Sequence, residues 1–564
     1  MTRKGLLMGV RKVMLAQGIL AFAGSVFGDV RATRFGAVYA PRETAAFTCD
    51  AGGAWRVTDW QGNEIATGTT AGGSLSISHA ALGLRSGAFR LAIGSDETWF
   101  AFLPTAKVRP CGWVGTGTHG SHGWSGGDYR YLDLIAAAGI GVVRDDVGWQ
   151  SSEREKGKYV FDGKLHGLVD GLRQRGIRFH PVLLGQNALY ENPLDPDAYA
   201  AFAAAFVGEF KGKVASCDIF NEPHNTDFPR VYLPEGGEFK DWQCRPDAPW
   251  IPKHRELTRK AVSAIKAVDP GFSPGVGVED YWAFFKSCML ANNGAPSGLV
   301  AADDLVSIHT YGTKTEARPE MNYLFVDGGQ DVLNTLRQNG GATRLVITEA
   351  GWTTCSGSEG LARACSLVEQ AQYLVRFHIL ARQHGVEFAC QYDFMNDGSD
   401  RTNQEHNFGI VREDYTPKPS FSAVATMTRL IGNAAPLGSK SANEAEWRFY
   451  DFSRGDRRVM AAWSLDGERS VDVPDGCSLE GVRCVDLQGN EIPVPVENGR
   501  LRLTEAPIYL VDAVGGLFDD DGERWTSCMM SEAIPIVPGV KSMDEALTAM
   551  PVNTGKIGPI ISFW

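Results

Sequence analysis

The sequence lacks the cysteine and histidine spacings that are typical of zinc sites. Neither a Cys-x-x-Cys pair nor a His-Glu-x-x-His motif occurs in its 564 residues. We therefore expect no metal ligands and no cofactor. Cysteine is also scarce: 11 residues are too few for a scaffold built on disulfides, and an odd number leaves at least one of them unpaired.

Two cysteine pairs lie close enough in sequence for a local disulfide. Cys355 and Cys365 flank one loop, and Cys477 and Cys484 could close a hairpin in an oxidising compartment. Buried free thiols are an equally good interpretation, because unpaired cysteine is among the most buried residue types. The spacing leaves both interpretations open.

Long basic runs are absent as well, and the formal net charge is -12 at pH 7. A protein that binds nucleic acid needs a clustered cationic surface to neutralise the phosphates. We therefore expect no nucleic-acid partner. An acidic surface suits a protein with a neutral substrate, although it does not establish one.

Only one long apolar run occurs, from Val13 to Phe27. Basic residues precede it and small residues at Ala21 and Ala23 offer a cleavage site, which is the order of a secretory signal peptide. The alternative is an uncleaved membrane anchor, for which the run is short. We predict a signal peptide over residues 1–28, no other transmembrane segment, and a secreted or periplasmic protein.

Short alternating strands separated by turn residues occupy both flanks of the chain. Residues 31–105 and 433–513 show this pattern, which predicts a small antiparallel β-sandwich in each. The letters Gln-Gly-Asn-Glu-Ile occur in both, at 61–65 and 488–492, and we interpret them as a shared type I′ turn. No role is predicted for the tail, 514–564.

The central region, residues 108–432, alternates strands with helices that end at glycines. Eight such units favour an α/β fold, a (β/α)8 TIM barrel flanked by the N-terminal and C-terminal β-sandwich domains. An open doubly wound sheet would need a phosphate loop after its first strand, and residues 115–120 match only the letters of that motif. The predicted barrel strands are 112–119, 141–147, 177–186, 214–220, 272–279, 305–311, 344–348 and 386–393.

Polar side chains stand at the C-terminal ends of these strands, where the active sites of this barrel form. Each one alone could be a surface residue or a satisfied buried group, but polar endings on eight successive strands favour a site. The two catalytic candidates are Glu222 and Glu349. The substrate-binding candidates are His119, Arg144, Asn187, Asn221, His309, Tyr311, Trp352 and Tyr392.

Glu222 ends the fourth predicted strand and Glu349 the seventh, so their side chains can meet across the mouth of an eight-stranded ring. Retaining glycosidases use two carboxyl groups about 5–5.5 Å apart, one as nucleophile and one as general acid/base. Arg144 could keep Glu349 ionised by its opposite charge. Asn221 could bind a sugar 2-hydroxyl.

These motifs resemble those of glycoside hydrolase clan A, the retaining enzymes on a (β/α)8 barrel. Asn221-Glu222-Pro223 and Thr348-Glu349-Ala350-Gly351 resemble the clan's fourth-strand and seventh-strand motifs, and Ser307-Ile-His-Thr-Tyr-Gly312 resembles its sixth-strand motif. The resemblance implies that Glu222 is the acid/base and Glu349 the nucleophile.

A further stretch narrows the resemblance to the family 39 and family 5 type. It comprises residues 143–149 with the Gly-x-Tyr-x-Phe turn that ends the segment 153–162. One position departs from the clan pattern: many members carry a tryptophan on the eighth strand as a sugar platform, whereas Tyr392 occupies that stretch here. Either Tyr392 or Trp352 could replace it.

We therefore predict a secreted retaining β-glycosidase that hydrolyses the O-glycosidic bonds of oligo- or polysaccharides through a glycosyl-enzyme intermediate. The alternatives are a non-catalytic carbohydrate-binding protein on the same barrel and a transglycosidase that uses the same residues. No residue distinguishes one sugar from another or endo from exo action.

Overall fold

The computed structural model describes most of the chain between residues 30 and 518. The described residues are 30–122, 128–224, 227–232, 248–279, 289, 304–312, 316–326, 334–335, 337–338, 344–357, 363–454, 457–512 and 517–518. The predicted signal peptide and nearly all of the tail lie outside them. Within the described part, no helix is both long enough and apolar enough to cross a membrane.

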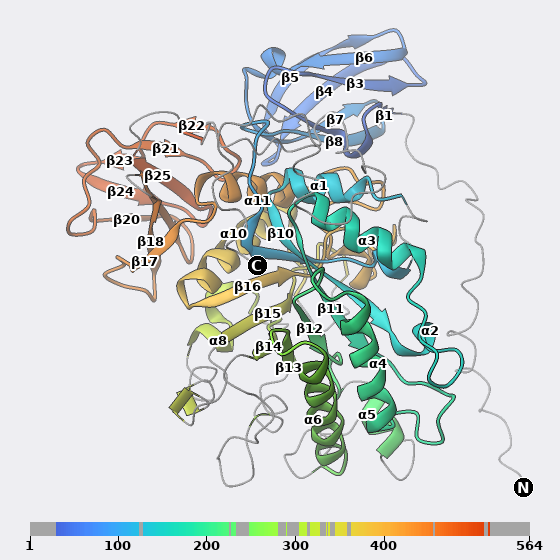
Figure 1. Cartoon of the computed structure of the whole chain (residues 1–564). Helices are drawn as coiled ribbons and strands as arrows, with labels where there is room; N and C mark the ends of the chain where they lie inside the picture. Colours follow the sequence, from blue (N-terminus) through green and yellow to red (C-terminus); the bar gives the residue numbers. More distant parts are fainter. Residues whose placement is uncertain are drawn as a thin grey trace, which may run out of the picture.

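Eight parallel strands close into a barrel at the centre of the molecule (Figure 1). They follow one another in sequence order around the ring, and the last pairs with the first. Each strand end lies within two residues of its predicted position, so the predicted (β/α)8 barrel is confirmed. The strands are β9 (Cys111–Gly117), β10 (Ile140–Gly148), β11 (Arg178–Leu184), β12 (Ser216–Ile219), β13 (Ser273–Glu279), β14 (Leu305–His309), β15 (Arg344–Ala350) and β16 (Val386–Gln391).

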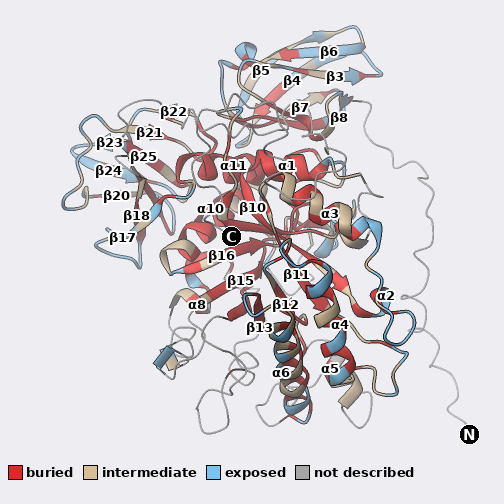
Figure 2. Cartoon of the chain, viewed as in Figure 1, coloured by how far each residue is buried: buried red, intermediate tan, exposed pale blue. Residues whose placement is uncertain are grey.

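Helices surround the barrel and bury apolar residues against it (Figure 2). Helix α6 shows the cause, since its buried residues Leu257, Ala261 and Ile265 recur every four positions. Helix α10 begins with a capping box in which Ser366 and Glu369 bond each other's backbone N–H groups. The helices are α1 (Tyr131–Ala137), α2 (Trp149–Ser152), α3 (Gly163–Gln174), α4 (Pro196–Glu209), α5 (Asp227–Tyr232), α6 (Trp250–Val268), α8 (Tyr323–Val326), α10 (Leu367–Gln383) and α11 (Pro419–Leu430).

A β-sandwich of two antiparallel-rich sheets precedes the barrel, as predicted. Phenylalanines from both sheets fill the space between them. Phe47 and Phe100 are in edge-to-face contact, with their ring centroids 5.2 Å apart. One sheet has the order β1 (Val30–Ala32), β3 (Thr44–Cys49), β6 (Gly73–Ser78). The other has the order β2 (Val38–Tyr39), β8 (Asp96–Phe102), β7 (Gly87–Ile93), β4 (Gly53–Asp59), β5 (Glu64–Thr70).

A second pair of sheets follows the barrel and confirms the C-terminal sandwich. The larger sheet has the order β17 (Ala435–Ser439), β18 (Trp447–Arg454), β19 (Arg457–Ser464), β25 (Ile508–Asp512), β21 (Arg483–Val485), β22 (Glu491–Ile492). The smaller sheet has the order β20 (Arg469–Val471), β24 (Arg500–Leu503), β23 (Val496–Glu497). A buried cluster joins this sandwich to the barrel: Glu320 accepts from both Arg376 and the indole N–H of Trp463, at 2.7 Å each.

The repeated Gln-Gly-Asn-Glu-Ile segments form matching turns, but the predicted type I′ geometry is wrong. Type I′ needs positive φ at both central residues. In each loop only the glycine has it, at 89° for Gly62 and 95° for Gly489. The carboxylates of Asp59 and Asp486 accept backbone N–H groups two and four residues ahead, which holds both loops in a type I turn followed by a left-handed glycine.

The two turns nevertheless differ in what they contact. Gln61 of the first is exposed, whereas Gln488 of the second is fully buried where the two sandwiches and the barrel meet. The side-chain oxygen of Gln488 accepts from the backbone N–H of Ala88 and from the hydroxyl of Ser422, and its amide donates to the carbonyl of Pro419. This one side chain therefore ties three parts of the molecule together.

Free thiols are the interpretation that holds for the four cysteines considered above. Cys355, Cys365, Cys477 and Cys484 are all unpaired, and three of them are buried.

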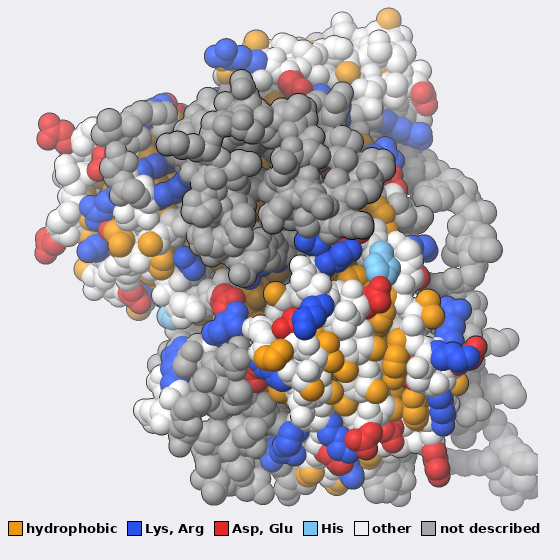
Figure 3. Space-filling view, in the orientation of Figure 1, with side chains coloured by type: hydrophobic (Ala, Val, Ile, Leu, Met, Phe, Trp, Pro, Cys, Tyr) orange, Lys and Arg blue, Asp and Glu red, His pale blue; other side chains and the backbone are white. Residues whose placement is uncertain are grey.

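On the face drawn in Figure 3, Lys and Arg side chains are interspersed with Asp and Glu over α3, α4 and α6.

Candidate active site

Glu222 lies just beyond β12, where the chain makes a sharp turn. Phe220 and Glu222 have positive φ values of 68° and 37°, although neither is glycine. Such backbone persists only where its surroundings hold it, and Phe220 is buried between Tyr199 and Phe228. Burial of the phenylalanine therefore fixes the turn that presents Glu222 at the carboxyl end of the barrel.

Glu349 stands in β15 directly opposite His309 of β14 in the strand register. Its two carboxylate oxygens have separate donors. Nη1 of Arg144 donates to Oε1 at 2.7 Å, and the hydroxyl of Tyr311 donates to Oε2 at 2.8 Å. A carboxylate with a guanidinium on one oxygen and a phenol on the other is held in one orientation.

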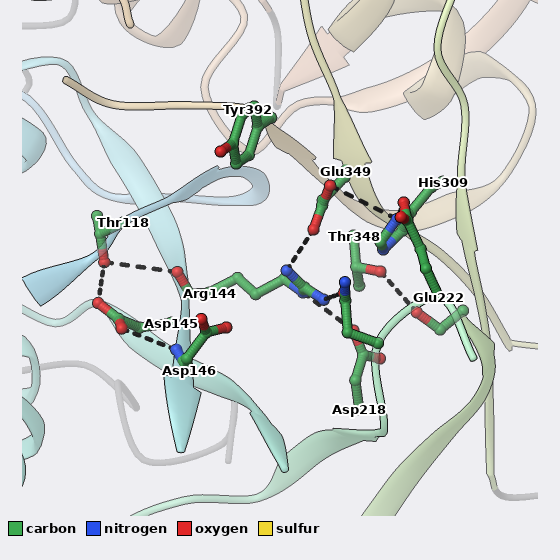
Figure 4. A network of polar contacts seen from close by, with 12 residues as sticks. Thr118, Arg144, Asp145, Asp146, Asp218, Glu222, His309, Thr348, Glu349 and Tyr392 are labelled. Carbon is green, nitrogen blue, oxygen red and sulfur yellow. Dashed lines mark hydrogen bonds and ion pairs between the residues drawn. The ribbon is translucent and has the colours of Figure 1, made fainter. Parts of the chain in front are cut away.

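His309 lies between the two glutamates (Figure 4). Its Nδ1 is 2.7 Å from Oε1 of Glu222 and 3.5 Å from Oε2 of Glu349, and the three groups lie within 4.8 Å of one another. Burial alone would lower the pKa of His309, but the charges of Glu349 and Glu222 outweigh it and the pKa is raised. The site therefore favours a cationic imidazole between two carboxyl groups.

Arg144 crosses the barrel from β10 and joins three residues at once (Figure 4). Besides Glu349, it donates to Oδ2 of Asp218 at 3.1 Å and to Oδ1 of Asn221 at 2.6 Å. Burial would lower the pKa of Arg144, yet Glu349 and Asp218 raise it above its usual range. The guanidinium is thus a permanent positive charge beside Glu349.

Asp218 is a functional residue that the sequence reasoning did not identify. It is fully buried in β12, with Oδ1 3.1 Å from Nε2 of His180 and Oδ2 bonded to Arg144. Burial acts to raise its pKa, but His180 and Arg144 together lower it well below its usual range. The available signal was an aspartate directly before the apolar residues Ile219 and Phe220 of a predicted buried strand, because a buried charge requires a partner.

His119 reaches the same mouth from the loop after β9, and Asp145 fixes that loop. The Asp145 carboxylate accepts from the hydroxyl of Thr118 at 2.6 Å and from the backbone N–H of Gly120 at 2.8 Å, on either side of His119. Nε2 of His119 is 3.3 Å from the hydroxyl of Tyr392. Loop and tyrosine therefore meet at the rim.

Tyr392 lies beside the catalytic candidates. Its ring is in edge contact with Tyr311, which bonds Glu349, and with Phe408, at centroid distances of 6.4 and 5.4 Å. Figure 4 shows it next to Glu349. Of the two aromatic residues considered as sugar platforms, this is the one that the fold brings to the site.

The structure does not bring Asn187 and Trp352 to the site. Asn187 is fully buried, and its amide donates to the backbone carbonyl of Glu153 while its oxygen accepts from Leu189. Trp352 is 3% exposed, and its indole N–H donates to the carbonyl of Ala317. Both side chains are satisfied within the protein, so the geometry does not favour the substrate contacts predicted for them.

The donor set of Glu222, His309 and Glu349 has the spacing of a metal site but not its electrostatics. Arg144 and Tyr311 already donate to both oxygens of Glu349. A guanidinium 2.7 Å from a ligand oxygen repels a metal cation, so these three groups suit proton transfer and nucleophilic attack better than coordination.

No protein-family model matches the chain. No curated protein matches it in sequence. Among solved structures, it is similar to a family 39 glycoside hydrolase from the gut symbiont Bacteroides cellulosilyticus WH2, with a TM-score of 0.66, 23% identity, and coverage of 84% of this chain and 98% of that one. A family 30 subfamily 8 xylanase from Clostridium acetobutylicum gives a TM-score of 0.47 at 13% identity, covering 72% and 97% of the two chains. At these identities the likeness to the first structure shows a shared fold.

Proposed function

We propose that the protein is a glycoside hydrolase that cleaves O-glycosidic bonds of carbohydrates with retention of configuration. One observation carries the proposal: oxygens of Glu222 and Glu349, from the ends of β12 and β15, lie within 4.8 Å of each other at the barrel mouth. Retaining enzymes hold the two carboxyl groups about 5–5.5 Å apart, and inverting ones about 6.5–9.5 Å. The short separation supports retention, and the family 39 fold neighbour supports the class.

In the first half of the reaction, Glu349 attacks the anomeric carbon. The bond from that carbon to the leaving oxygen breaks, and Glu222 supplies the proton that the leaving oxygen takes up. Arg144 and Tyr311 support the attack, because their hydrogen bonds hold the Glu349 carboxylate in one orientation. The product of this step is a glycosyl ester on Glu349.

In the second half, a water molecule replaces the departed group. Glu222 accepts its proton, the water oxygen bonds the anomeric carbon, and the ester bond to Glu349 breaks, which restores both residues. Two inversions give overall retention. His309, in contact with both carboxyl groups, keeps them at a fixed separation through both steps.

Asn221 is oriented for a sugar hydroxyl. Nη2 of Arg144 donates to its side-chain oxygen, so the amide N–H groups are what Asn221 presents to a ligand. A hydrogen bond to the 2-hydroxyl strengthens in the transition state of retaining enzymes. Asn221 therefore acts with Arg144 as one unit.

The test is hydrolysis of a panel of aryl β-glycosides by the wild type, Glu349→Gln and Glu222→Gln. Glu349→Gln is expected to lose turnover of every substrate. Glu222→Gln is expected to lose about 10²–10⁴-fold on substrates with poor leaving groups and far less on activated ones, which need no proton. Glu155→Gln, an exposed change on the same barrel, serves as the matched control. Wild-type rates in Glu349→Gln would refute the proposal.

Export is a separate proposal, supported by residues 1–28 alone. Expression of the full chain in a host with a secretory pathway is expected to give a product that begins after the apolar run, as N-terminal sequencing would show. Retention of the intact N-terminus in the exported or membrane fraction would contradict cleavage.

A further inference from the structure

A second cluster of metal-ligating side chains lies beside the proposed catalytic pair. It consists of His119 from the loop after β9 and of Asp393 and Asp397, which follow β16. One ligand atom of each lies within 4.8 Å of the other two, and Nε2 of His119 is 3.8 Å from Oδ2 of Asp397. More than 270 positions separate His119 from the two aspartates, and the pairing of β16 with β9 brings them together.

Asp393 supplies an independent observation. It is 1% exposed, and among the residues that the structure describes neither of its carboxylate oxygens has a hydrogen-bond partner. A buried carboxylate without a partner costs several kcal/mol unless something else neutralises it. Its atoms lie toward His119 and Asp397, so the missing partner belongs in that cluster.

The nearby ammonium group of Lys418 does not serve as that partner. Its three N–H donors are already used, on the hydroxyl of Thr354 at 3.0 Å, the side-chain oxygen of Asn396 at 2.8 Å and the carbonyl of Asn407 at 3.0 Å. Lys418 therefore contributes charge from a distance but no hydrogen bond to Asp393.

Neighbouring charges add to the requirement for a cation. Asp397 and Glu405 both act on Asp393 as like charges, and Lys418 acts on it with the opposite charge. A divalent cation bound between Asp393 and Asp397 would offset the repulsion between these like charges.

We propose that His119, Asp393 and Asp397 bind a divalent transition-metal ion of the Zn²⁺ or Mn²⁺ class. An imidazole nitrogen with two carboxylates is a donor set for such ions, whereas Ca²⁺ and Mg²⁺ take oxygen ligands. Zinc bonds to nitrogen and oxygen are about 2.0–2.2 Å long, so neighbouring ligand atoms of a tetrahedral ion are about 3.4 Å apart. Nε2 of His119 and Oδ2 of Asp397, which are 3.8 Å apart, are already close to that spacing, and the Asp397 side chain is 23% exposed.

Such an ion would organise the rim of the proposed active site. It would hold the β9 loop, which Asp145 already anchors through Thr118 and Gly120, against the segment that carries Tyr392. The proposed role is structural, and the proposal stands whether or not the protein hydrolyses glycosides.

The test is calorimetric titration of the chelator-treated full chain with ZnCl₂ and with MnCl₂, alongside the melting temperature with and without each ion. The wild type is expected to bind one ion per chain and to melt at a higher temperature with it. Asp393→Asn and Asp397→Asn are expected to lose both effects. Asp397→Asn changes an exposed side chain, so it guards against a folding defect in Asp393→Asn.

Glu222→Gln is the control for the other cluster, Glu222, His309 and Glu349, which has a similar spacing. It is expected to bind the ion as the wild type does. Three results would overturn the proposal: no binding by the wild type, unchanged binding in both aspartate variants, or loss of binding in Glu222→Gln.

Discussion

Nη1 of Arg144 lies 2.7 Å from Oε1 of Glu349, and this ion pair links β10 to β15 across the barrel with both side chains nearly buried. An exposed pair of this kind stabilises a protein little, because water screens it. A buried pair is different: removal of one partner leaves an uncompensated charge in the interior. The same contact therefore supports the fold and orients the proposed nucleophile.

Arg144→Met should lower both activity and stability. It removes the counter-charge of Glu349 and of Asp218 together. We expect loss of most of kcat/KM and a decrease of about 3–5 kcal/mol in the free energy of unfolding, measured by urea titration. Arg401→Met, which breaks the more exposed pair with Glu413, should cost about 1 kcal/mol or less. Equal losses in the two variants would contradict the account.

Tyr311→Phe should lower kcat, and it should also lower the free energy of unfolding by about 1.5–3 kcal/mol. The variant keeps the ring but removes the hydroxyl that donates to Glu349. A hydrogen bond to a charged group contributes about 1.5–3 kcal/mol, which corresponds to about 10–150-fold in rate. Tyr509→Phe is the control, because its buried hydroxyl has no hydrogen-bond partner within the described part of the chain. A wild-type kcat in Tyr311→Phe would remove this residue from the mechanism.

Asp218 should make the stability depend on pH on the acid side. Its pKa in the folded protein is lowered by His180 and Arg144 despite burial. The stability it contributes is therefore fully present above the unfolded-state pKa, about 3.9, and is lost as the pH falls below it toward the folded-state pKa. The free energy of unfolding would be measured for the wild type and Asp218→Asn between pH 7 and pH 3. The difference between the two proteins should be constant down to about pH 4 and should become smaller below it. If the difference in free energy of unfolding increased toward acid pH, the pKa of Asp218 would be shifted in the opposite direction, which would contradict the account.

Gln488→Ala should destabilise the contact between the three parts of the molecule. It leaves the buried N–H of Ala88 without its side-chain acceptor and removes one donor from the carbonyl of Pro419, which keeps the hydroxyl of Ser422, at a cost of about 1–3 kcal/mol. Gln61→Ala replaces the equivalent glutamine of the exposed segment and should lower the free energy of unfolding by about 0.5 kcal/mol or less. Thermal unfolding of both variants makes the comparison. If the two variants lost the same stability, the loss would come from the turn that both segments share and not from the contacts of Gln488 with the barrel and the N-terminal sandwich.

The barrel could be predicted because its signals are local. Apolar runs and helix-ending glycines placed all eight strands within two residues, and the ends of β12 and β15 marked Glu222 and Glu349. A strand end, however, tells which edge a residue lies on and not where its side chain points. Asn187 follows β11 but turns into the protein to bond Glu153.

Contacts between distant segments account for what the sequence did not predict. Asp218 is paired with Arg144, 74 positions away, and nothing local marks that partnership. The grouping of His119 with Asp393 arises only when the ring closes by pairing β16 with β9. The predicted type I′ turn was wrong for a local reason. The Asp59 side chain accepts the loop N–H groups and so favours a type I turn.

The central claim is that Glu349 forms a covalent bond to the sugar, and a trapped adduct tests it most directly. The wild type would be incubated with the 2-deoxy-2-fluoro analogue of an aryl β-glycoside that it hydrolyses, followed by mass spectrometry of the intact protein and its peptides. The account predicts one glycosyl group per chain, located on Glu349 and absent from Glu349→Gln. Inactivation with the label on another residue, or turnover of the parent glycoside with inversion and no adduct, would contradict it.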